Sequence, residues 1–300
     1  MKIFKTLFYF TNSFRKVSTT LSNFQHKNFS LKVDKNMVGL QLKEILKNFE
    51  SIAPLKTAES WDNVGLLVEP DSNANINTVL LTIDLTEEVV QEAVEIGAQL
   101  IVSYHPNIFK PLKTVTQNSW KERIIIQCIK NNIAVFSPHT SWDAMQNGVN
   151  DWLGSFLPTS SSKPILTKTE DSPIGMGRFL ILKEPTPLEQ VIIAVKKLIE
   201  IPHLRLGLGK GKTLDSPITT VALCAGSGTG VLAGTEADLY LTGEMLHHDV
   251  LDAAQKGISV ILCNHSDSER GYLKNFQKSF SSEQLAIFIS KLDKDCLTTV

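Results

Sequence analysis

Apolar residues recur along the chain in two patterns, one typical of amphipathic helices and one of buried strands. Residues 40–52 carry apolar side chains at helical spacing, which predicts a helix with one apolar face. These side chains are Leu42, Ile45, Leu46, Phe49 and Ile52. A strand (79–83), a helix (86–96), Gly97 and a second strand (99–103) follow, and this order predicts a βαβ unit.

The same alternation of strands and helices continues to the end of the chain. A strand at 133–138 and a helix at 147–157 complete a first α/β lobe over residues 37–157. Residues 158–172, PTSSSKPILTKTEDS, have the composition of a linker or exposed loop. The second α/β lobe is expected over residues 173–300. Its predicted strands are 179–183, 220–225, 238–242 and 259–263, and its helices are 187–200 and 245–256.

The two lobes share a sequence echo. Residues 79–105 laid over 239–265, at a constant offset of 160, give seven identities in 27 positions, among them His105 with His265. Asp84 meets Glu244 in the same alignment. A search over offsets also finds such a score by chance, so internal duplication and coincidence both stay open. If the echo is real, each lobe sends an acid and a histidine to the ends of adjacent strands.

Composition narrows the class of protein. The chain of 300 residues is 42% hydrophobic and 20% charged, which is ordinary for a globular protein. A formal charge of -1 gives no basic field for nucleic acid, so direct nucleic-acid binding is not indicated. Four widely separated cysteines without a C-x-x-C pair argue against a zinc ribbon or a disulfide framework and favour a reducing compartment. No apolar run is long enough for a membrane span, so we expect no membrane partner.

Residues 1–36 form a separate segment that is basic and rich in Ser, Thr and Phe. All its charged side chains before Asp34 are basic, as in a mitochondrial presequence. Only Arg15 among them is an arginine, and Met37 stands just before the first patterned helix, so translation from Met37 is the alternative. We expect a disordered or targeting segment and an intracellular protein, cytoplasmic with import into mitochondria.

Candidate metal ligands follow several buried strands. His105 closes the strand 99–103, but a lone histidine there is more often a hydrogen-bonding residue. His265 and Glu269 are four residues apart, and His139 and Asp143 repeat this spacing after another strand. On a helical turn such spacing places both side chains on one face, as metal ligands require. Imidazole and carboxylate ligands without thiolate suit Zn, Fe, Mn or Co.

Other motifs are weaker. TGEMLHHD contributes Glu244, His247 and His248. Because adjacent residues on a helix point in different directions, at most one of the two histidines can face a shared site. GKGKT (209–213) lacks the glycine that a P-loop needs, so we reject a P-loop there. GSGTG (226–230) misses the dinucleotide pattern, and a plain tight turn is expected, with a flexible anion-receptive turn as the alternative. Trp61 and Asp62 are expected to be a packed indole and a turn carboxylate.

Seven motifs in order resemble the NGG-1-interacting factor 3-like (NIF-3-like) family, also catalogued as GTP cyclohydrolase I type 2. They are WDNVGLLVE, SYHP, SPHTSWD, NGVND, AGSG, DLYLTGEMLHHD and NHSDSERG. The resemblance runs from about residue 40 to the C-terminus and is greatest to animal members. It implies two related α/β lobes with mixed central sheets and flanking helices around a dinuclear metal site between the lobes. It also implies a homo-oligomer, because bacterial members form rings.

The resemblance assigns roles by position. His105, Asp143, His265 and Glu269 match family metal ligands for one or two divalent ions, Zn, Fe or Mn. Tyr104 stands where bacterial members usually have a histidine, and a neutral phenol is a poor ligand for Zn, so the second ion is in doubt. Glu244, His247 and His139 are expected to orient ligands or to transfer protons.

The implied function is metal-dependent hydrolysis of an unknown substrate, with nucleotides and phosphoesters as candidates. The alternative is a non-enzymatic interaction protein linked to transcription, whose metal serves folding or assembly and which is present in the nucleus. Tyr104 favours this alternative. So does the short 158–172 segment, because larger family members carry an inserted domain there.

Overall fold

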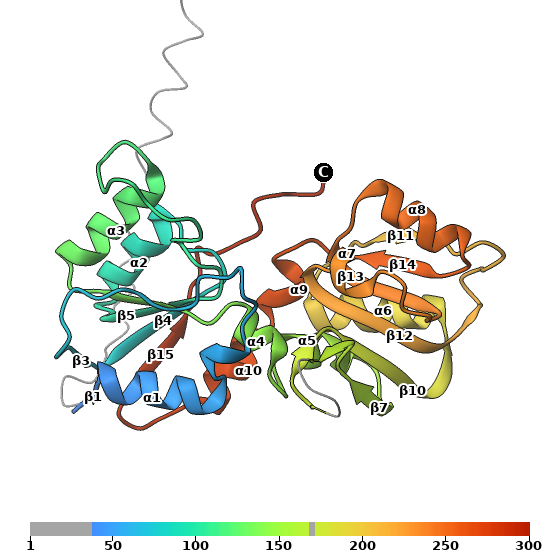
Figure 1. Ribbon diagram of the computed structural model, residues 1–300, viewed down its shortest axis with the longest axis horizontal. Helices are drawn as coiled ribbons and strands as arrows, with labels where there is room; N and C mark the ends of the chain where they lie inside the picture. Colours follow the sequence, from blue (N-terminus) through green and yellow to red (C-terminus); the bar gives the residue numbers. More distant parts are fainter. Residues whose placement is uncertain (1–37, 168–171) are drawn as a thin grey trace, which may run out of the picture. The chain divides into compact units, whose positions relative to one another are not determined.

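The computed structural model describes residues 38–167 and 172–300, so the predicted targeting segment at 1–36 lies outside the described residues. The first of two mixed sheets has five strands in the order β15-β4-β5-β6-β2, of which β15, β4 and β5 are labelled in Figure 1. Four of its strands are parallel, and β2 runs antiparallel to β6. The strands are β15 (Ala286–Ile289), β4 (Thr78–Thr82), β5 (Leu100–Ser103), β6 (Ala134–Ser137) and β2 (Gly65–Val68).

Helices cover both faces of this sheet. The helices α2 (Glu87–Glu95) and α3 (Trp120–Lys130) pack on the face that carries Leu80 and Ile101. On the other face lie α1 (Leu42–Ile52) and α10 (Tyr272–Ser279) (Figure 1). The strands are therefore apolar on both sides, as expected of a buried parallel sheet. The helix predicted at 40–52 corresponds to α1, which begins after an N-cap at Gln41.

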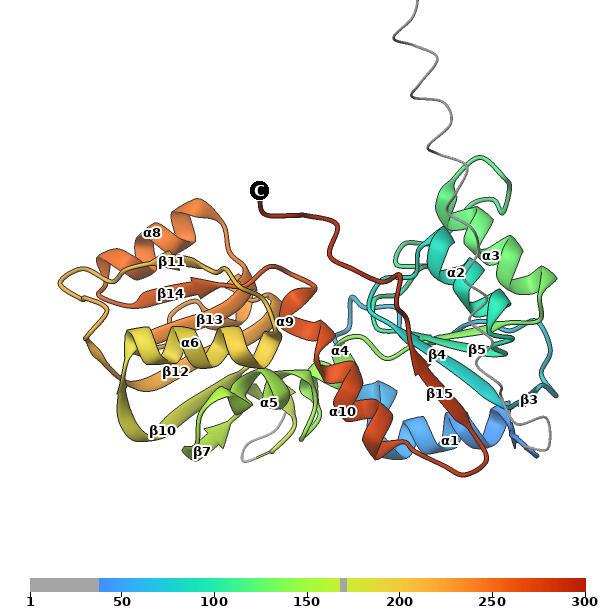
Figure 2. The ribbon, with the colours of Figure 1, turned by 180° about the vertical axis from the view of Figure 1, so that it is seen from behind.

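The second sheet has six strands in the order β11-β14-β13-β12-β10-β7, of which β12, β13 and β14 are parallel. Figure 2 shows α6 (Leu188–Ile199) and α5 (Val149–Leu153) along one face, whereas α8 (His247–Gln255) and α7 (Thr229–Leu232) pack on the other. The strands are β11 (Arg205–Gly207), β14 (Ser259–Leu262), β13 (Leu239–Glu244), β12 (Pro217–Ser227), β10 (Arg178–Pro187) and β7 (Thr159–Lys163).

Short elements complete the fold. Two two-stranded sheets pair β1 (Leu40–Gln41) with β3 (Asn75–Ile76), and β8 (Leu166–Thr167) with β9 (Gly175–Met176). The helix expected at 147–157 is shorter: α5 ends at Leu153 and continues only as a 3-10 turn to Phe156, two residues before Pro158. The remaining short elements are α4 (Thr140–Ala144), α9 (Asp267–Arg270) and a 3-10 turn at Leu55–Thr57.

The sheets do not coincide with the expected ranges of the lobes. Residues 159–163 of the expected linker form β7, an edge strand that pairs with β10 in the second sheet. At the other end of the chain, β15 returns to the first sheet and pairs in parallel with β4. The domain ranges 37–157, 158–172 and 173–300 therefore stay a prediction. The sheets themselves cross these ranges, because part of the expected linker belongs to the second sheet and a strand of the expected second lobe belongs to the first.

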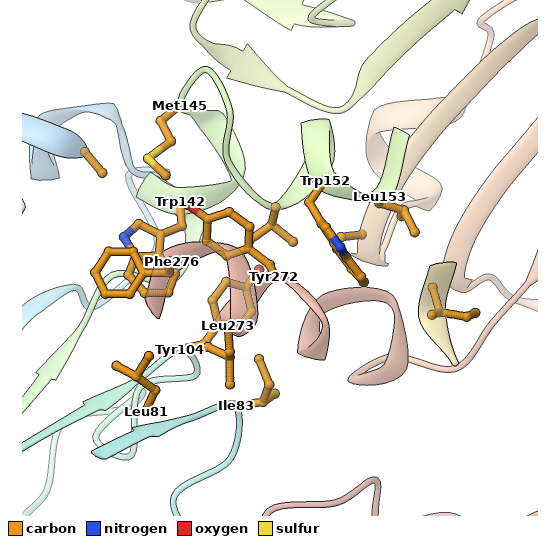
Figure 3. Close-up of a cluster of buried hydrophobic side chains, with 14 of the residues drawn as sticks. Leu81, Ile83, Tyr104, Trp142, Met145, Trp152, Leu153, Tyr272, Leu273 and Phe276 are labelled. Carbon is orange, nitrogen blue, oxygen red and sulfur yellow. The ribbon is translucent and has the colours of Figure 1, made fainter. Parts of the chain in front are cut away.

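One apolar core extends across both sheets. It joins Leu81 and Val102 of the first sheet to Leu223 and Leu241 of the second through the aromatic residues of α4 and α10. The rings of Trp142 and Phe276 are centred 4.2 Å apart in the middle of this core (Figure 3). Among the described residues, no helix has both the length and the apolar character needed to cross a bilayer.

The offset of 160 residues recurs in the secondary structure. The helices α2 (Glu87–Glu95) and α8 (His247–Gln255) begin and end at positions that differ by this offset. Gly97 and Gly257 follow these helices with φ of 68° and 84°. Residues with a side chain disfavour this left-handed backbone conformation, whereas glycine adopts it readily. Each helix thus turns back, in the same way, into a strand that ends shortly before a histidine.

Candidate metal centre

Three side chains from distant parts of the chain converge at the carboxyl ends of β5 and β14. Nε2 of His105 lies 3.4 Å from Oε2 of Glu269, and Nε2 of His265 lies 3.5 Å from Oε1. One ligand atom of each residue lies within 4.8 Å of the others, close enough to share a metal ion. We call His105, His265 and Glu269 the metal-binding group. It contains three of the four ligands that the resemblance assigns.

Each histidine of the metal-binding group is oriented by a second carboxylate. Nδ1 of His105 lies 2.9 Å from Oδ1 of Asp84, and Nδ1 of His265 lies 3.0 Å from Oε2 of Glu244. A carboxylate on Nδ1 fixes the ring and leaves Nε2 for the ion. The two acid–histidine pairs are those that the offset of 160 aligns. The ligand-orienting role of Glu244 stays a prediction, and its contact with His265 is the geometry that such a role requires. Asp84 received no such role from the sequence, although the echo contained the signal.

Gly226 allows β12 of the second sheet to approach the metal-binding group closely. Its φ is 65°, and a Cβ atom there would lie 2.6 Å from Oε1 of Glu269 and 3.2 Å from Nε2 of His265. Ser268 completes this corner, because its hydroxyl accepts from the amide of Gly226 at 2.8 Å and donates to the carbonyl of His265. The GSGTG stretch therefore joins the end of β12 to the start of α7 through Gly228, instead of forming a separate turn, and its first glycine makes room for the ligands.

The electrostatics of the group fit a cation. The side chain of Glu269 is 2% exposed, and its Oε2 and the Nε2 of His105 are buried without a hydrogen-bond partner. Burial disfavours a charged His105, but the carboxylates of Glu269 and Asp84 outweigh it and raise the pKa of His105 to about 10. Two unpartnered buried ligand atoms beside an excess of carboxylate suit a divalent ion with nitrogen and oxygen ligands.

Tyr104 and Asp143 form a separate pair beside the metal-binding group. The Tyr104 hydroxyl donates to Oδ1 of Asp143 at 2.5 Å, and both residues are buried. Burial, and then the charge of Asp143, raises the pKa of Tyr104 well above its ordinary value, so the phenol stays neutral. Burial likewise raises the pKa of Asp143 to about 6. The metal-binding group does not include Asp143, whose role as a ligand stays a prediction.

His139 forms a third acid–histidine pair, with Asp62. Its Nδ1 lies 2.7 Å from Oδ1 of Asp62, whose other oxygen accepts from the amide and hydroxyl of Thr140. The His139 backbone has φ of 33°, which is rare for a residue with a side chain and common at functional sites. Its ring centre lies 5.4 Å from that of His105. Asp62 is therefore more than the expected turn carboxylate.

Trp61 differs from expectation, whereas the assisting role of His247 stays a prediction. Trp61 is 59% exposed, so the expected packed indole is wrong, because the indole lies edge-on to His139 instead of entering the core. His247 was predicted to assist the site, but it and His248 are both exposed on α8 with their ring centres 5.3 Å apart. The contacts of the described residues do not bring His247 into the metal-binding group.

A cavity opens beside the metal-binding group. It has a volume of about 650 Å³ and is lined by His105 and His265 together with residues of β13, the GSGTG stretch and the C-terminus. This volume lies in the range of small-molecule sites. A ligand in the cavity would contact both His105, which follows β5 of the first sheet, and His265, which follows β14 of the second.

Fold and site together define a mixed α/β protein with a histidine–carboxylate group that can hold a metal ion. Residues 40–296 match the family profile described as Duf34/NIF3 (NGG1p interacting factor 3), and the chain belongs to this family. NIF3-like protein 1 of Rattus norvegicus is 39% identical over 87% of this chain and 93% of its own length. NGG1-interacting factor 3 of Saccharomyces cerevisiae is 37% identical over 86% of this chain and 96% of its own length.

A solved structure shares the fold of this chain. Reduced HcgD from Methanocaldococcus jannaschii superposes with a TM-score of 0.74 and 27% identity. The match covers 85% of this chain and all of the HcgD chain. The family resemblance seen in the motifs is therefore confirmed, and so is the mixed α/β fold.

Proposed function

We propose that the protein is a metal-dependent hydrolase in which His105, His265 and Glu269 hold one divalent ion between the two sheets. The observation that carries this proposal is the convergence of the three residues, with two buried ligand atoms lacking any other partner. Both unpartnered atoms are costly to bury unless a ligand satisfies them. An ion would do so for both at once.

The ion, when bound, would lower the pKa of a water molecule and polarise the bond to be cleaved. Asp84 and Glu244 hold the two imidazoles with Nε2 free, and His105 gives up its proton when an ion binds. His139 is the residue we assign to proton transfer. Its Nδ1 is held by Asp62, which leaves Nε2 as the exchanging nitrogen near His105.

We propose one ion instead of the two of a dinuclear site, because the Tyr104 hydroxyl donates a hydrogen bond to Asp143. A hydrogen bond of 2.5 Å engages an oxygen that a second ion would need. The phenol supplies no negative charge to such an ion, since its pKa is raised by burial.

The variant Tyr104→His is expected to raise the metal content from about one to two ions per chain. A neutral imidazole is a good ligand for a divalent ion, whereas a neutral phenol is a poor one. Metal content is measured by elemental analysis after loading and exhaustive dialysis. The variant Tyr104→Phe, which removes the hydroxyl and adds no ligand, is the matched control and should stay at one ion. An equal count for wild type and Tyr104→His would show that the phenol is not what limits the site.

Removal of the ion is expected to abolish turnover. The substrate we propose is a phosphoester or a nucleotide, because its charged oxygens suit a divalent ion and the cavity of about 650 Å³ accepts molecules of this size. Protein loaded with Mn, Fe or Zn would be compared with chelated protein on a panel of both substrate classes. Turnover should vanish on chelation and return on reloading. Activity that survives complete removal of metal would refute the hydrolase proposal.

A second candidate is a protein-interaction role linked to transcription, in which metal serves folding or assembly. The name of the yeast relative describes that protein as interacting with NGG1. The segment that follows β5 and ends with the first residue of α3 supports a protein partner, since several of its large apolar side chains are exposed. They are Phe109, Leu112, Val115 and Trp120. A folded, metal-loaded protein that is inert on the panel, but retains a partner after Glu269→Gln, would favour this role.

We also propose homo-oligomerisation and an intracellular location, cytoplasmic with mitochondrial and nuclear pools. The exposed apolar segment 109–120 is compatible with contacts between copies. The basic character of residues 1–36 supports import.

A further inference from the structure

We infer that Asp293 is a positioning residue of the metal-binding group and that the C-terminal tail, residues 290–297, joins the two halves of that group. The inference rests on the proposed metal centre. The tail follows β15 and leaves the first sheet at Ser290, whose amide donates to the carbonyl of Leu81 at 2.8 Å. Its Ser290 hydroxyl and Lys291 amide are both held by Glu92 of α2.

Asp293 contacts the half of the centre that carries His105. One of its oxygens accepts from the amide of Ile83 at 2.7 Å, and the other lies 3.4 Å from the amide of Asp84. Asp84 is the carboxylate that orients His105. The tail therefore fixes the backbone from which that carboxylate extends.

The same carboxylate contacts the half that carries His265 and Glu269. Asp293 forms an ion pair with Arg270, the residue after Glu269. Arg270 in turn donates to the hydroxyl of Ser266, the residue after His265, at 2.9 Å. Ser266 also donates to Asp295 at 2.7 Å, so the tail holds this turn at two points.

The burial of Asp293 gives these contacts their weight. Its side chain is 2% exposed, and its charge is met by one guanidinium and two backbone amides. A buried carboxylate with charge-assisted bonds orients its neighbours far better than an exposed one. Further along the tail, Asp295, Cys296 and Leu297 line the cavity beside the centre. The tail thus sets the separation of His105 from Glu269 and closes one side of the cavity.

The test compares Asp293→Asn with wild type by cobalt titration of the full chain. The amide keeps the shape but loses the charge that holds Arg270. Cobalt affinity is expected to fall about 10- to 100-fold, the usual effect of removing a residue that orients ligands. The visible absorption bands of bound cobalt should also shift, because the ligand geometry changes. Asp293→Glu, which restores the charge, should recover part of the affinity.

Asp238→Asn is the matched control. Asp238 also accepts from two backbone amides, at 3.0 Å each, and pairs with a lysine, but it lies at the amino end of β13. This variant should bind cobalt as wild type does, with unchanged bands. A stability loss shared by both variants then cannot explain a cobalt effect seen only at Asp293.

The tail itself can be followed through Cys296, the one exposed cysteine of the four. Its rate of reaction with a thiol reagent should rise in Asp293→Asn, because the tail loses its anchor. If Asp293→Asn does not fold, Asp293→Glu decides, since it must bind cobalt more weakly than wild type with displaced bands. Affinity within about twofold of wild type, with unchanged bands, would overturn the role of Asp293. A wild-type protein that binds no cobalt would overturn the metal centre itself.

Discussion

Replacing Glu269 by glutamine is expected to lower metal affinity by at least about 100-fold and to abolish turnover, because the Glu269 carboxylate contacts both histidines of the centre. Glutamine keeps the size of the side chain but removes its charge. Without that charge, His105 and His265 face an amide that cannot balance a divalent ion. Affinity is measured by competition with a chromophoric chelator.

Thermal unfolding gives a second readout of the same variant. An ion at a free concentration of 100 times its Kd stabilises the folded protein by about 2.7 kcal/mol. Wild type should therefore show a metal-dependent rise in Tm that Glu269→Gln lacks. Glu122→Gln is the control, because Glu122 is a carboxylate held by Thr114 and Thr116 at the start of α3, outside the centre. A normal metal-induced rise in Glu269→Gln would contradict the assignment of this ligand.

Replacing Arg178 by alanine is expected to destabilise the protein by about 3–5 kcal/mol, the usual cost of breaking a buried ion pair from one side. The Arg178 side chain is 2% exposed and makes a forked contact with Asp151, at 2.6 and 3.0 Å. It also donates to the carbonyls of Met145, Gly175 and Gly177. Alanine would leave these buried acceptors without donors. Urea unfolding measures the loss.

The same contacts connect Arg178 with the site. The bond to Met145 ties β10 to the turn after α4, the helix that carries Asp143. Arg178→Lys should recover only part of the stability, because an ammonium cannot reproduce the fork of the guanidinium. Arg123→Ala is the control, since Arg123 forms a surface ion pair with Glu87 and should change the unfolding midpoint little. Equal midpoints for Arg178→Ala and Arg123→Ala would contradict this account of the core.

Strands and helices with strong periodicity were predictable from the sequence. The βαβ unit, β12, β13 and β14, and the helices α1, α2, α6 and α8 lie within a few residues of their predicted ranges. Their apolar positions repeat at helical or strand spacing, so burial and local structure favour the same pattern. The histidines at the strand ends were predictable for the same reason, because parallel strands deliver their carboxyl ends to one edge.

Elements that depend on distant partners were not predicted. The strand β15 is short and half-buried, and it exists because β4 offers it a free edge. The helix α10 has Tyr272, Leu273 and Phe276 buried at helical spacing, so its local pattern was present in the sequence. Its packing against Trp142, which lies far away in the sequence, was not predictable from that pattern. Asp84 likewise acts through His105, 21 residues away. Asp293 pairs with Arg270, but its contacts with the amides of Ile83 and Asp84 span 210 and 209 residues. The spacing of His265 and Glu269 pointed to a pair of ligands, and the family resemblance assigned His105 to the same site. The distances between the three side chains come only from the fold.

Anomalous diffraction from crystals of the zinc-loaded protein tests the central claim most directly. The account predicts one strong peak per chain, at about 2.0–2.2 Å from Nε2 of His105, Nε2 of His265 and a carboxylate oxygen of Glu269. A peak bound to residues of only one half of the chain, or no peak near Glu269 in crystals that contain zinc, would contradict it.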